Sequence, residues 1–419
     1  MIILQNCSSA QTNAEVPVNF KNYISGVGNY SLTSNDTKTN LRMYAFYKCN
    51  NLTSVVVSGA SKHLSQHAFY ECDNLTQVVL QDGVEEINGS FYNCHALTTV
   101  KMPNSIKVIY DGSFTGCDAI QYSENHNNKY LGNDDNSWLV LCHCEEDAID
   151  PYCKVIQGGA ARESSTLTSI TIPDSVTNIN SEAFYNCPNL TSIYIGSGVQ
   201  NIGSSAFSNC ESLNTINVSP NNQYYRAEGN CLIYGSRIIL GCDSSIIPNS
   251  GVSEIYAGAF DGAKQLTTIT IPSNITSLYT GAFRYSGLVS ITVPDTVTSM
   301  GSQVFYHCAN LTSATLSRSI DFVPSGCFSG CSSLFTFTIN DNSTAIGSYA
   351  FSQCTGLASI TIPSSVTLID YDAFGDCSSL VDINYGGTMS DWGNITLGSD
   401  WNRNTGNYTI HCTDGDIPK

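Results

Sequence analysis

The chain has 419 residues and a formal net charge of −18, because 35 acidic side chains outnumber 17 basic ones. A surface that holds nucleic acid or anionic lipid needs clustered Lys and Arg, so this balance argues against both partners. No run of about 18 apolar residues occurs, so the sequence predicts no membrane-spanning helix and no membrane insertion.

The first 40 residues show no regular pattern. The opening "MIILQNCSSAQTN" has no basic leader and only a short apolar stretch, whereas a secretory signal carries about 7–15 apolar residues. Cleavage before Cys7 in the manner of a lipoprotein fits poorly, because the preceding Asn6 is bulky and polar. No signal peptide is visible, and we expect residues 1–40 to form an N-terminal cap.

From residue 46 onward a Phe recurs at steps of 23 or 22 residues. It stands at Phe46, Phe69, Phe91, Phe114, Phe184, Phe207, Phe260, Phe283, Phe305, Phe328, Phe351 and Phe374. The first long gap hides a weak copy in which Ala161 replaces the aromatic, and the second is one repeat stretched by an insertion. A fixed period of this length indicates stacked repeats rather than separate globular domains.

A strand opens each repeat. In "LTSITIPDSVTNINSEAFYNCPN", which starts at Leu167, Ile170 and Ile172 alternate with polar residues as in a short strand. Pro173 ends that strand, because proline has no N–H to donate to a neighbour.

The second half of each repeat leads to the Phe. Val176 and Ile179 are expected to point inward from an extended stretch. The segment "SEAF" (181–184) predicts a single capped helical turn. The residue before the Phe is small in almost every copy, which lets neighbouring turns approach closely.

Such a unit cannot bury its apolar side alone, so copies must stack with strands paired in parallel about 4.8 Å apart. The Phe side chains then form one continuous internal column. We predict a solenoid of about 13 coils of roughly 22–23 residues. Its parallel β-ladder would lie on the concave side, with extended segments and short helical turns on the convex side.

The pattern resembles the BspA-like leucine-rich-repeat family, whose unit reads roughly L-x-x-I-x-L-P-x-x-[VL]-x-x-I-x-x-x-A-F-x-x-C-x-x. The resemblance covers residues 41–385. It implies a leucine-rich-repeat solenoid, found largely in bacterial surface or secreted proteins and in some parasitic protists. Members that resemble it act as adhesins for host or neighbouring-cell proteins.

Two insertions interrupt the period, at residues 118–155 and 219–245. In the second, "NCLIY" and "RIILGC" flank Gly235-Ser236, which predicts a hairpin with a two-residue turn. The first insertion is expected to be a less regular hairpin of the same kind. From Gly386 the period is lost, and residues 386–419 are expected to form a C-terminal cap that brings two Trp residues.

Ten of the 18 cysteines occupy one position of the repeat. They are Cys49, Cys72, Cys94, Cys117, Cys187, Cys210, Cys308, Cys331, Cys354 and Cys377. Because Ala263 and Ser286 fill the same position elsewhere, we predict a small buried slot that holds free thiols. If any disulfide forms, the pair favoured is Cys231 with Cys242, near opposite ends of one hairpin.

No catalytic or metal-binding signature is present. Cys142-His143-Cys144 with Cys153 lacks zinc-finger spacing, and alternation along a strand would turn His143 away from its neighbours. No nucleophile elbow, phosphate loop, zincin helix or calcium loop occurs. Acidic pairs such as Asp134-Asp135 indicate a solvated edge. We therefore expect no enzyme, no metal and no cofactor.

Residues between the inward-facing positions of each strand form a face of Ser and Thr with almost no charge. The candidate binding residues on it are Thr99, Lys101, Ser169, Thr171, Ser192, Tyr194, Thr215, Asn217, Thr268, Thr270, Ser290 and Thr292. Two interpretations remain open: a rigid surface for a partner, or a filler surface with good β-propensity. Binding hot spots favour Tyr, Trp and Arg, so the insertions offer another site through Tyr224, Tyr225, Arg226 and Trp138.

The function predicted is a non-enzymatic surface or secreted adhesion module, monomeric, that binds another protein. One alternative is a structural spacer or antigen without a defined ligand. A second alternative is glycan binding, for which the strand face is short of paired aromatic residues.

Overall fold

The computed structural model describes residues 29–32, 43–50, 52–57 and 59–419. The N-terminal cap predicted at residues 1–40 lies outside these residues, except for one strand, β1. The chain folds into two units. Unit 1 comprises Met1–Cys187, Tyr194–Phe207 and Asn221–Gln223, and unit 2 comprises Pro188–Ile193, Ser208–Pro220 and Tyr224–Lys419.

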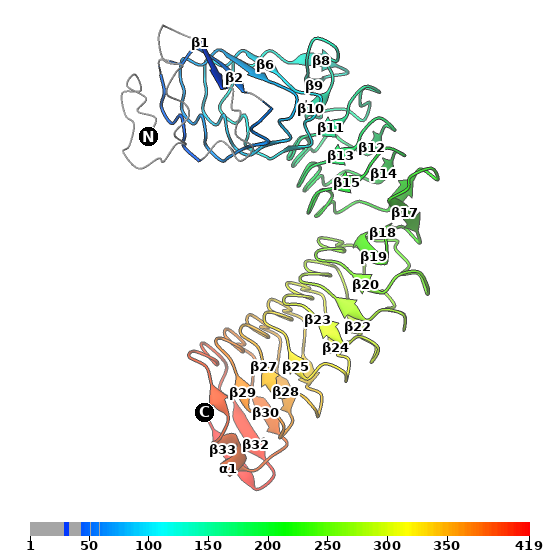
Figure 1. The fold of residues 1–419 in the computed structure, drawn as a ribbon. Coiled ribbons are helices and arrows are strands. Elements are labelled where there is room, and N and C mark those ends of the chain that lie inside the picture. Colours follow the sequence, from blue (N-terminus) through cyan, green and yellow to red (C-terminus); the bar gives the residue numbers. More distant parts are fainter. Residues whose placement is uncertain (1–28, 33–42, 51, 58) are drawn as a thin grey trace. The chain divides into compact units, whose positions relative to one another are not determined.

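The described residues form a parallel-strand solenoid of about 16 turns with almost no helix (Figure 1). Within these residues α1 (Met389–Trp392) is the one α-helix. The turn count exceeds the prediction because some turns carry no repeat Phe. β1 (Asn29–Leu32) precedes the first Phe, and β32 (Thr409–Cys412) follows the last one.

Unit 1 contains a ladder of longer strands. They are β1, β2 (Ser54–Val57), β4 (Gln77–Leu80) and β6 (Thr99–Lys101), paired in parallel in that order. Val55 faces Val78, and Val78 faces Val100, so each residue stands beside its counterpart in the next repeat. The side chains of these three valines are buried, as the alternation predicts.

A second parallel ladder of two-residue strands runs through the stretches that the sequence predicted only as extended. In unit 1 it comprises β3 (His63–Leu64), β5 (Glu86–Ile87) and β7 (Val108–Ile109), then β11 (Val155–Ile156), β13 (Asn178–Ile179) and β15 (Asn201–Ile202). The second residue of each pair is apolar. Leu64, Ile87 and Ile109 are fully buried.

Unit 2 repeats the same two-ladder plan. Its short strands are β20 (Glu254–Ile255), β21 (Ser277–Leu278) and β23 (Ser299–Met300), then β25 (Phe322–Val323), β27 (Ala345–Ile346), β29 (Leu368–Ile369) and β31 (Thr396–Leu397). Its longer strands are β22 (Ser290–Thr292) with β24 (Ser313–Thr315), then β26 (Thr336–Thr338), β28 (Ser359–Ile362), β30 (Asp382–Tyr385) and β32. Three further long strands are β12 (Ser169–Ile172) in unit 1, β16 (Thr215–Val218) in unit 2 and β14 (Ser192–Ile195), whose residues divide between the units.

Both insertions fold as three antiparallel strands whose last member joins the short-strand ladder in parallel. The first holds β8 (Ser123–Asn125), β9 (Asn128–Leu131) and β10 (Val140–His143), and the second holds β17 (Tyr225–Glu228), β18 (Cys231–Tyr234) and β19 (Arg237–Leu240). β10 pairs with β11, and β19 pairs with β20. The hairpin predicted at Gly235-Ser236 is confirmed, with Gly235 at φ 59°.

The first hairpin of each insertion was missed. It turns at His126-Asn127 in one insertion and at Gly229-Asn230 in the other. All four residues have positive φ, between 49° and 58°, as a two-residue type I′ turn requires. The Gly-Asn dipeptide is a recognised hairpin signal and marks the second of these turns in the sequence.

The turn that carries each Phe is not helical, so the predicted helical turn at 181–184 is wrong. Glu182 and Asn186 have φ of 59° and 57°, and a left-handed residue on either side of the Phe breaks any helical run. The N–H of Phe184 therefore bonds to the carbonyl of Ala206 in the next repeat, at 2.8 Å. One left-handed residue lies two positions before the Phe and another lies two positions after it, and this pair recurs along the chain. We call the surface that these turns form the turn face.

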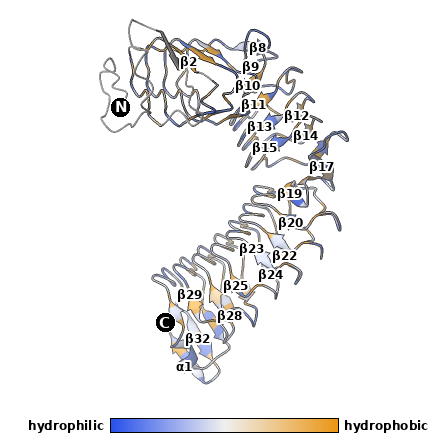
Figure 2. Ribbon diagram, in the orientation of Figure 1, coloured by the Kyte–Doolittle hydropathy of each residue, from blue (hydrophilic) through white to orange (hydrophobic). Residues whose placement is uncertain are grey.

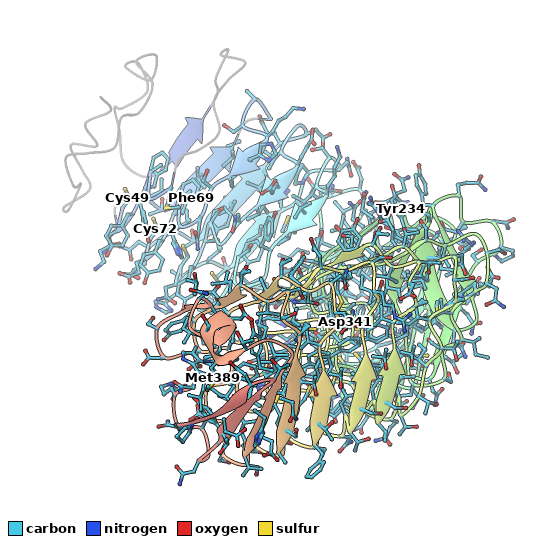
Figure 3. All side chains as sticks on the ribbon, turned by 90° about the horizontal axis from the view of Figure 1, so that it is seen from below. Cys49, Phe69, Cys72, Tyr234, Asp341 and Met389 are labelled. Carbon is cyan, nitrogen blue, oxygen red and sulfur yellow. The ribbon has the colours of Figure 1, made fainter. Side chains whose placement is uncertain are left out.

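The Phe side chains stack as an internal column within each unit. Rings from Phe46 to Phe114 lie 5.0 to 5.7 Å apart at interplanar angles of 0 to 7°. Rings from Phe260 to Phe374 lie 5.0 to 5.8 Å apart. All are buried except Phe46, which is half-buried. Figure 3 shows Phe69 and Cys72 within the body of unit 1.

The repeat cysteines stand beside this column. Cys72, Cys94, Cys117, Cys308, Cys331, Cys354 and Cys377 are buried free thiols, as predicted. The prediction is wrong for Cys49, which is disulfide-bonded. The sequence left open whether Cys231 and Cys242 form a disulfide, and both are free thiols. Each of these two thiols lies within 3.8 Å of a backbone carbonyl instead.

Residues 386–419 continue the solenoid instead of leaving it. β31 extends the short-strand ladder beyond β29, and β32 extends the long-strand ladder beyond β30. β33 (Gly415–Pro418) then pairs antiparallel with β32. Trp392 and Trp401 are buried, and the ring of Trp401 meets Phe374 edge-on at 6.1 Å.

Candidate functional site

The outward-facing residues of the long strands form the predicted candidate surface, which we call the strand face. In β12 the buried Ile170 and Ile172 alternate with the half-exposed Ser169 and the exposed Thr171. Figure 2 shows hydrophobic and hydrophilic residues following one another along the strands. The other candidates that lie on strands are half-exposed (Thr99, Lys101, Ser192, Thr215) or exposed (Tyr194, Asn217, Ser290, Thr292).

Two candidates lie outside any strand. Thr268 and Thr270 are exposed, but their segment makes no ladder pairing, so the strand expected there is absent from the described structure. Ile269 between them is only partly buried, whereas Ile170 at the matching position is 1% exposed. The second insertion has lengthened the preceding repeat, and the regular pairing resumes at β22.

In unit 1 the first insertion already engages part of the strand face. The ammonium of Lys101 donates to both carboxylate oxygens of Asp134, at 2.8 and 2.9 Å. The hydroxyl of Ser169 donates to Asp147 at 3.0 Å. Groups of the chain itself therefore already bind these two candidates. Tyr194, the one aromatic residue among the twelve candidates, is 37% exposed.

The alternative site on the insertions is partly accessible. Of its four residues, Tyr224 is exposed, whereas Tyr225 is buried. Arg226 donates to the carbonyls of Gly235 and Gly251, both at 2.8 Å. Tyr234, which the sequence did not single out, is 45% exposed on the second insertion (Figure 3).

The Cys142-His143-Cys144 segment is arranged as its alternation suggested. Cys142, Cys144 and Cys153 are buried, and His143 is exposed. Burial raises the pKa of Cys153 to about 12. Within the described part of the chain, no group of three or more His, Cys, Asp or Glu side chains is placed to hold a metal ion.

The turn face of unit 2 carries a groove of about 400 Å³ that sequence reasoning missed. Gly326, Ser329, Tyr306 and Tyr349 are among the residues that line it. The groove arises because the repeat around Phe328 has small residues, Gly326 and Ser329, at both outward positions, whereas each neighbouring repeat carries a tyrosine at one of them, Tyr306 or Tyr349. Gln303 and Tyr349 occupy in those neighbours the position that Gly326 fills.

An ion pair closes one end of the groove. Arg403 donates to both carboxylate oxygens of the buried Asp372, at 3.0 and 3.2 Å, and also contacts Asp376 at 2.9 Å. The hydrogen bond to Asp372 is the main reason why the pKa of Arg403 is raised above its ordinary value. The hydroxyl of Ser352 donates to Asp372 at 3.1 Å, so this end of the groove is held in a defined geometry.

The turn face of unit 1 has the opposite character, because bulky rings fill it. Tyr47, Tyr70 and Tyr92 follow the Phe in three successive repeats. The rings of Tyr47 and Tyr70 are tilted at 5.4 Å, and those of Tyr70 and Tyr92 stack at 5.5 Å. His67 stacks against Tyr44 at 5.2 Å. The three tyrosines at one repeat position are the sequence signal that could have revealed this aromatic surface.

Among the described residues, no helix has the length and apolar character needed to cross a membrane. The fold, with the strand face and the turn face repeated along it, is a leucine-rich-repeat solenoid. Proteins of this class are repeat scaffolds. The chain belongs to the BspA type leucine-rich repeat family, whose pattern matches residues 20–134, 140–233 and 243–394 in six copies.

Solved structures with a similar fold include bacterial leucine-rich-repeat proteins. One from Eubacterium ventriosum is 22% identical, with a TM-score of 0.53 and 91% of this chain and 89% of that chain covered. A leucine rich cell surface protein from Faecalibacterium prausnitzii is 27% identical over 91% and 89% of the two chains, with a TM-score of 0.49. The pneumococcal vaccine antigen PcpA is 14% identical over 92% and 89%, with a TM-score of 0.45. No curated protein matches the sequence.

Proposed function

We propose that the chain is a non-enzymatic binding module of a surface or secreted protein, and that a protein partner docks on its strand face. Family membership supports a surface role, since one structurally similar protein, from Faecalibacterium prausnitzii, is a leucine rich cell surface protein. The observation that carries the proposal is the register of the long-strand ladders. In β26, β28 and β30 the outward residues Thr338, Thr361 and Asn384 stand side by side in successive repeats.

This register gives a partner a prearranged surface. Backbone hydrogen bonds to the neighbouring strands hold each strand in place, so few side chains need to be ordered on binding. Hydroxyl and amide groups both donate and accept hydrogen bonds, which suits a partner backbone or polar side chains. The near absence of charge on this face lowers the cost of desolvating it.

Single lysine substitutions on the strand face test the proposal. Thr171→Lys, Tyr194→Lys and Asn217→Lys each add a long, charged, strongly hydrated side chain to an exposed strand position. Surface plasmon resonance would measure binding to purified collagen, laminin and fibronectin. We expect one of these proteins to bind, and at least one lysine variant to weaken that binding tenfold or more.

Gln265→Lys is the matched control, because it adds the same charge at an exposed position outside the strands. Equal loss in the control would show a general charge effect and contradict docking on the strand face. If none of the three proteins binds the unmodified chain, the spacer or antigen hypothesis is favoured instead.

A further inference from the structure

We infer that the groove on the turn face of unit 2 binds a neutral glycan, through one or two sugar rings. This site is separate from the strand face and does not depend on the partner proposed there. The inference uses the shape of the groove, its hydrogen-bonding groups, its aromatic walls and its charge.

The volume of about 400 Å³ lies in the range of sites that bind small molecules, roughly 300–1,000 Å³. The space exists because Gly326 and Ser329 leave one repeat without bulk between two repeats that carry it. Two other repeats with a glycine at this position fill the space differently. Where Gly258 and Gly281 stand at the position of Gly326, the side chains of Asp261 and Arg284 join across the two repeats at 2.8 Å.

The residues that line the groove offer the hydrogen-bond donors and acceptors that sugar hydroxyls require. Sugar hydroxyls both donate and accept hydrogen bonds, and they occur as neighbours on one ring. The groove offers the amides of Gln303 and Gln353, which do both, together with several serine hydroxyls. At its end, the Asp372 carboxylate accepts and the Arg403 guanidinium donates, and their pairing fixes both groups.

The aromatic walls supply the contact for the apolar side of a sugar ring. The C–H groups on one face of a pyranose pack against an aromatic ring, and Tyr adds a hydroxyl at its edge. Tyr349 is 46% exposed, and Tyr306 is half-buried on the other side. Tyr349 is held from behind by Tyr371, whose ring meets it edge-on at 5.2 Å.

Charge distinguishes neutral from acidic glycans. Asp372 and Asp376 pair with the same guanidinium, that of Arg403, and Asp370 lies beside Ser348, which lines the groove. These three carboxylates and the one guanidinium together carry a surplus of two negative charges. Sialylated or sulfated glycans would meet repulsion here, whereas neutral hexoses and N-acetylhexosamines would not.

The test is a printed glycan array with three arms: neutral, sialylated and sulfated oligosaccharides. The full chain should bind neutral glycans and none of the acidic ones above background. Gly326→Tyr should lower that signal at least tenfold, because the new ring fills the groove. Tyr349 at the equivalent position has φ of 59° and Gly326 has φ of 62°, so the turn can hold a tyrosine, at the cost of a left-handed side chain whose Cβ lies 3.0 Å from the Cγ of Gln303.

Two matched controls separate binding from folding. Gly258→Tyr places the same ring at the same repeat position outside the groove, at φ of 64°. Tyr256→Ala removes an exposed tyrosine elsewhere in unit 2, to be compared with Tyr349→Ala inside the groove. We expect both groove variants to lose binding and both controls to stay within twofold of the unmodified chain, with circular dichroism showing all four folded.

Three results would overturn the inference: no neutral glycan bound, acidic glycans preferred, or equal loss in the groove and control variants. Failure here leaves the proposed function standing if the lysine variants of the strand face still weaken protein binding. If the unmodified chain binds neutral glycans but none of the three matrix proteins, the groove inference stands and the proposed function fails.

Discussion

The thiol of Cys94 donates a hydrogen bond to the backbone carbonyl of Phe69, one repeat earlier, at 3.0 Å. The same bond recurs from Cys72 to Phe46 at 2.9 Å and from Cys354 to Phe328 at 3.0 Å. The left-handed turn leaves the carbonyl of each Phe pointing into the interior of the next repeat. A small side chain with a weak donor satisfies that buried acceptor, which explains why Cys is preferred there.

The loss of stability caused by a substitution at Cys354 should depend on whether the new side chain can donate a hydrogen bond to the carbonyl of Phe328. Cys354→Ala leaves the carbonyl of Phe328 with only the N–H of Cys331 as a donor, at 3.0 Å, and also leaves a small void, so we expect it to lower the free energy of unfolding by about 1–2 kcal/mol. Cys354→Ser should cost less, because its hydroxyl can donate to the same oxygen. Urea denaturation measures both, and a larger loss for Ser than for Ala would contradict this account.

The stacked Phe column should dominate the stability of unit 2. Phe351 is fully buried between the rings of Phe328 and Phe374, so Phe351→Ala should cost about 3–5 kcal/mol of unfolding free energy. Phe335→Ala is the control, because Phe335 is 62% exposed, and we expect a change within about 0.5 kcal/mol. Thermal and chemical denaturation would compare the two, and similar losses would mean that the column is not the main source of stability.

The left-handed residues beside each Phe should prefer Gly over β-branched side chains. Ser205 has φ of 55°, a conformation that costs an L-residue roughly 1–2 kcal/mol. Ser205→Val should therefore be destabilising by at least about 1 kcal/mol, because a β-branched residue fits this region worst. Ser205→Gly should be neutral or stabilising, since relief of strain offsets the greater freedom of the unfolded chain. The opposite order in denaturation experiments would argue against the turn geometry.

His411 should make the C-terminal strands sensitive to pH. Its two ring nitrogens lie 2.9 Å from Asp416 and 3.0 Å from Asp382, and these hydrogen bonds raise its pKa above the ordinary 6.5. A raised pKa in the folded state means that the stabilisation is fully present below about pH 6.5. It is lost as the pH rises through the folded-state value.

NMR titration should place the pKa of His411 above 6.5. Amide exchange in β33, corrected for its intrinsic rate, should then accelerate above that pKa. His411→Gln should remove this pH dependence. A His411 that titrates below 6.5, or a variant that keeps the same dependence, would refute the link.

The sequence predicted the repeat, the Phe column and the outward Ser and Thr residues, because the 22–23-residue spacing between copies and the alternation within each strand are both visible in it. The two-residue strands could not be predicted, since two residues have no alternation and pair only once a neighbouring repeat is in place. The helical turn predicted at 181–184 was wrong. The segment "SEAF" has residues that favour a helix N-cap, but hydrogen bonds to the next repeat impose the left-handed conformation around the Phe.

The groove was missed for a related reason. Gly326 and Ser329 carry no chemical signal of their own, and the space they leave depends on what flanks them in the adjacent repeats. The pairing of Asp372 with Arg403 joins residues 31 positions apart, outside the 23-residue period. Such a site becomes visible only when the columns of neighbouring repeats are compared side by side.

The antiparallel course of β33 has a consequence for self-association. A parallel ladder whose edge is left open can accept a strand from another molecule and so seed fibres. Here the edge of β32 is already taken by a strand of opposite direction, and Pro418 within it has no N–H to offer. Filament growth from this edge is thereby disfavoured, so concentrated solutions of the protein should resist end-to-end polymerisation through it.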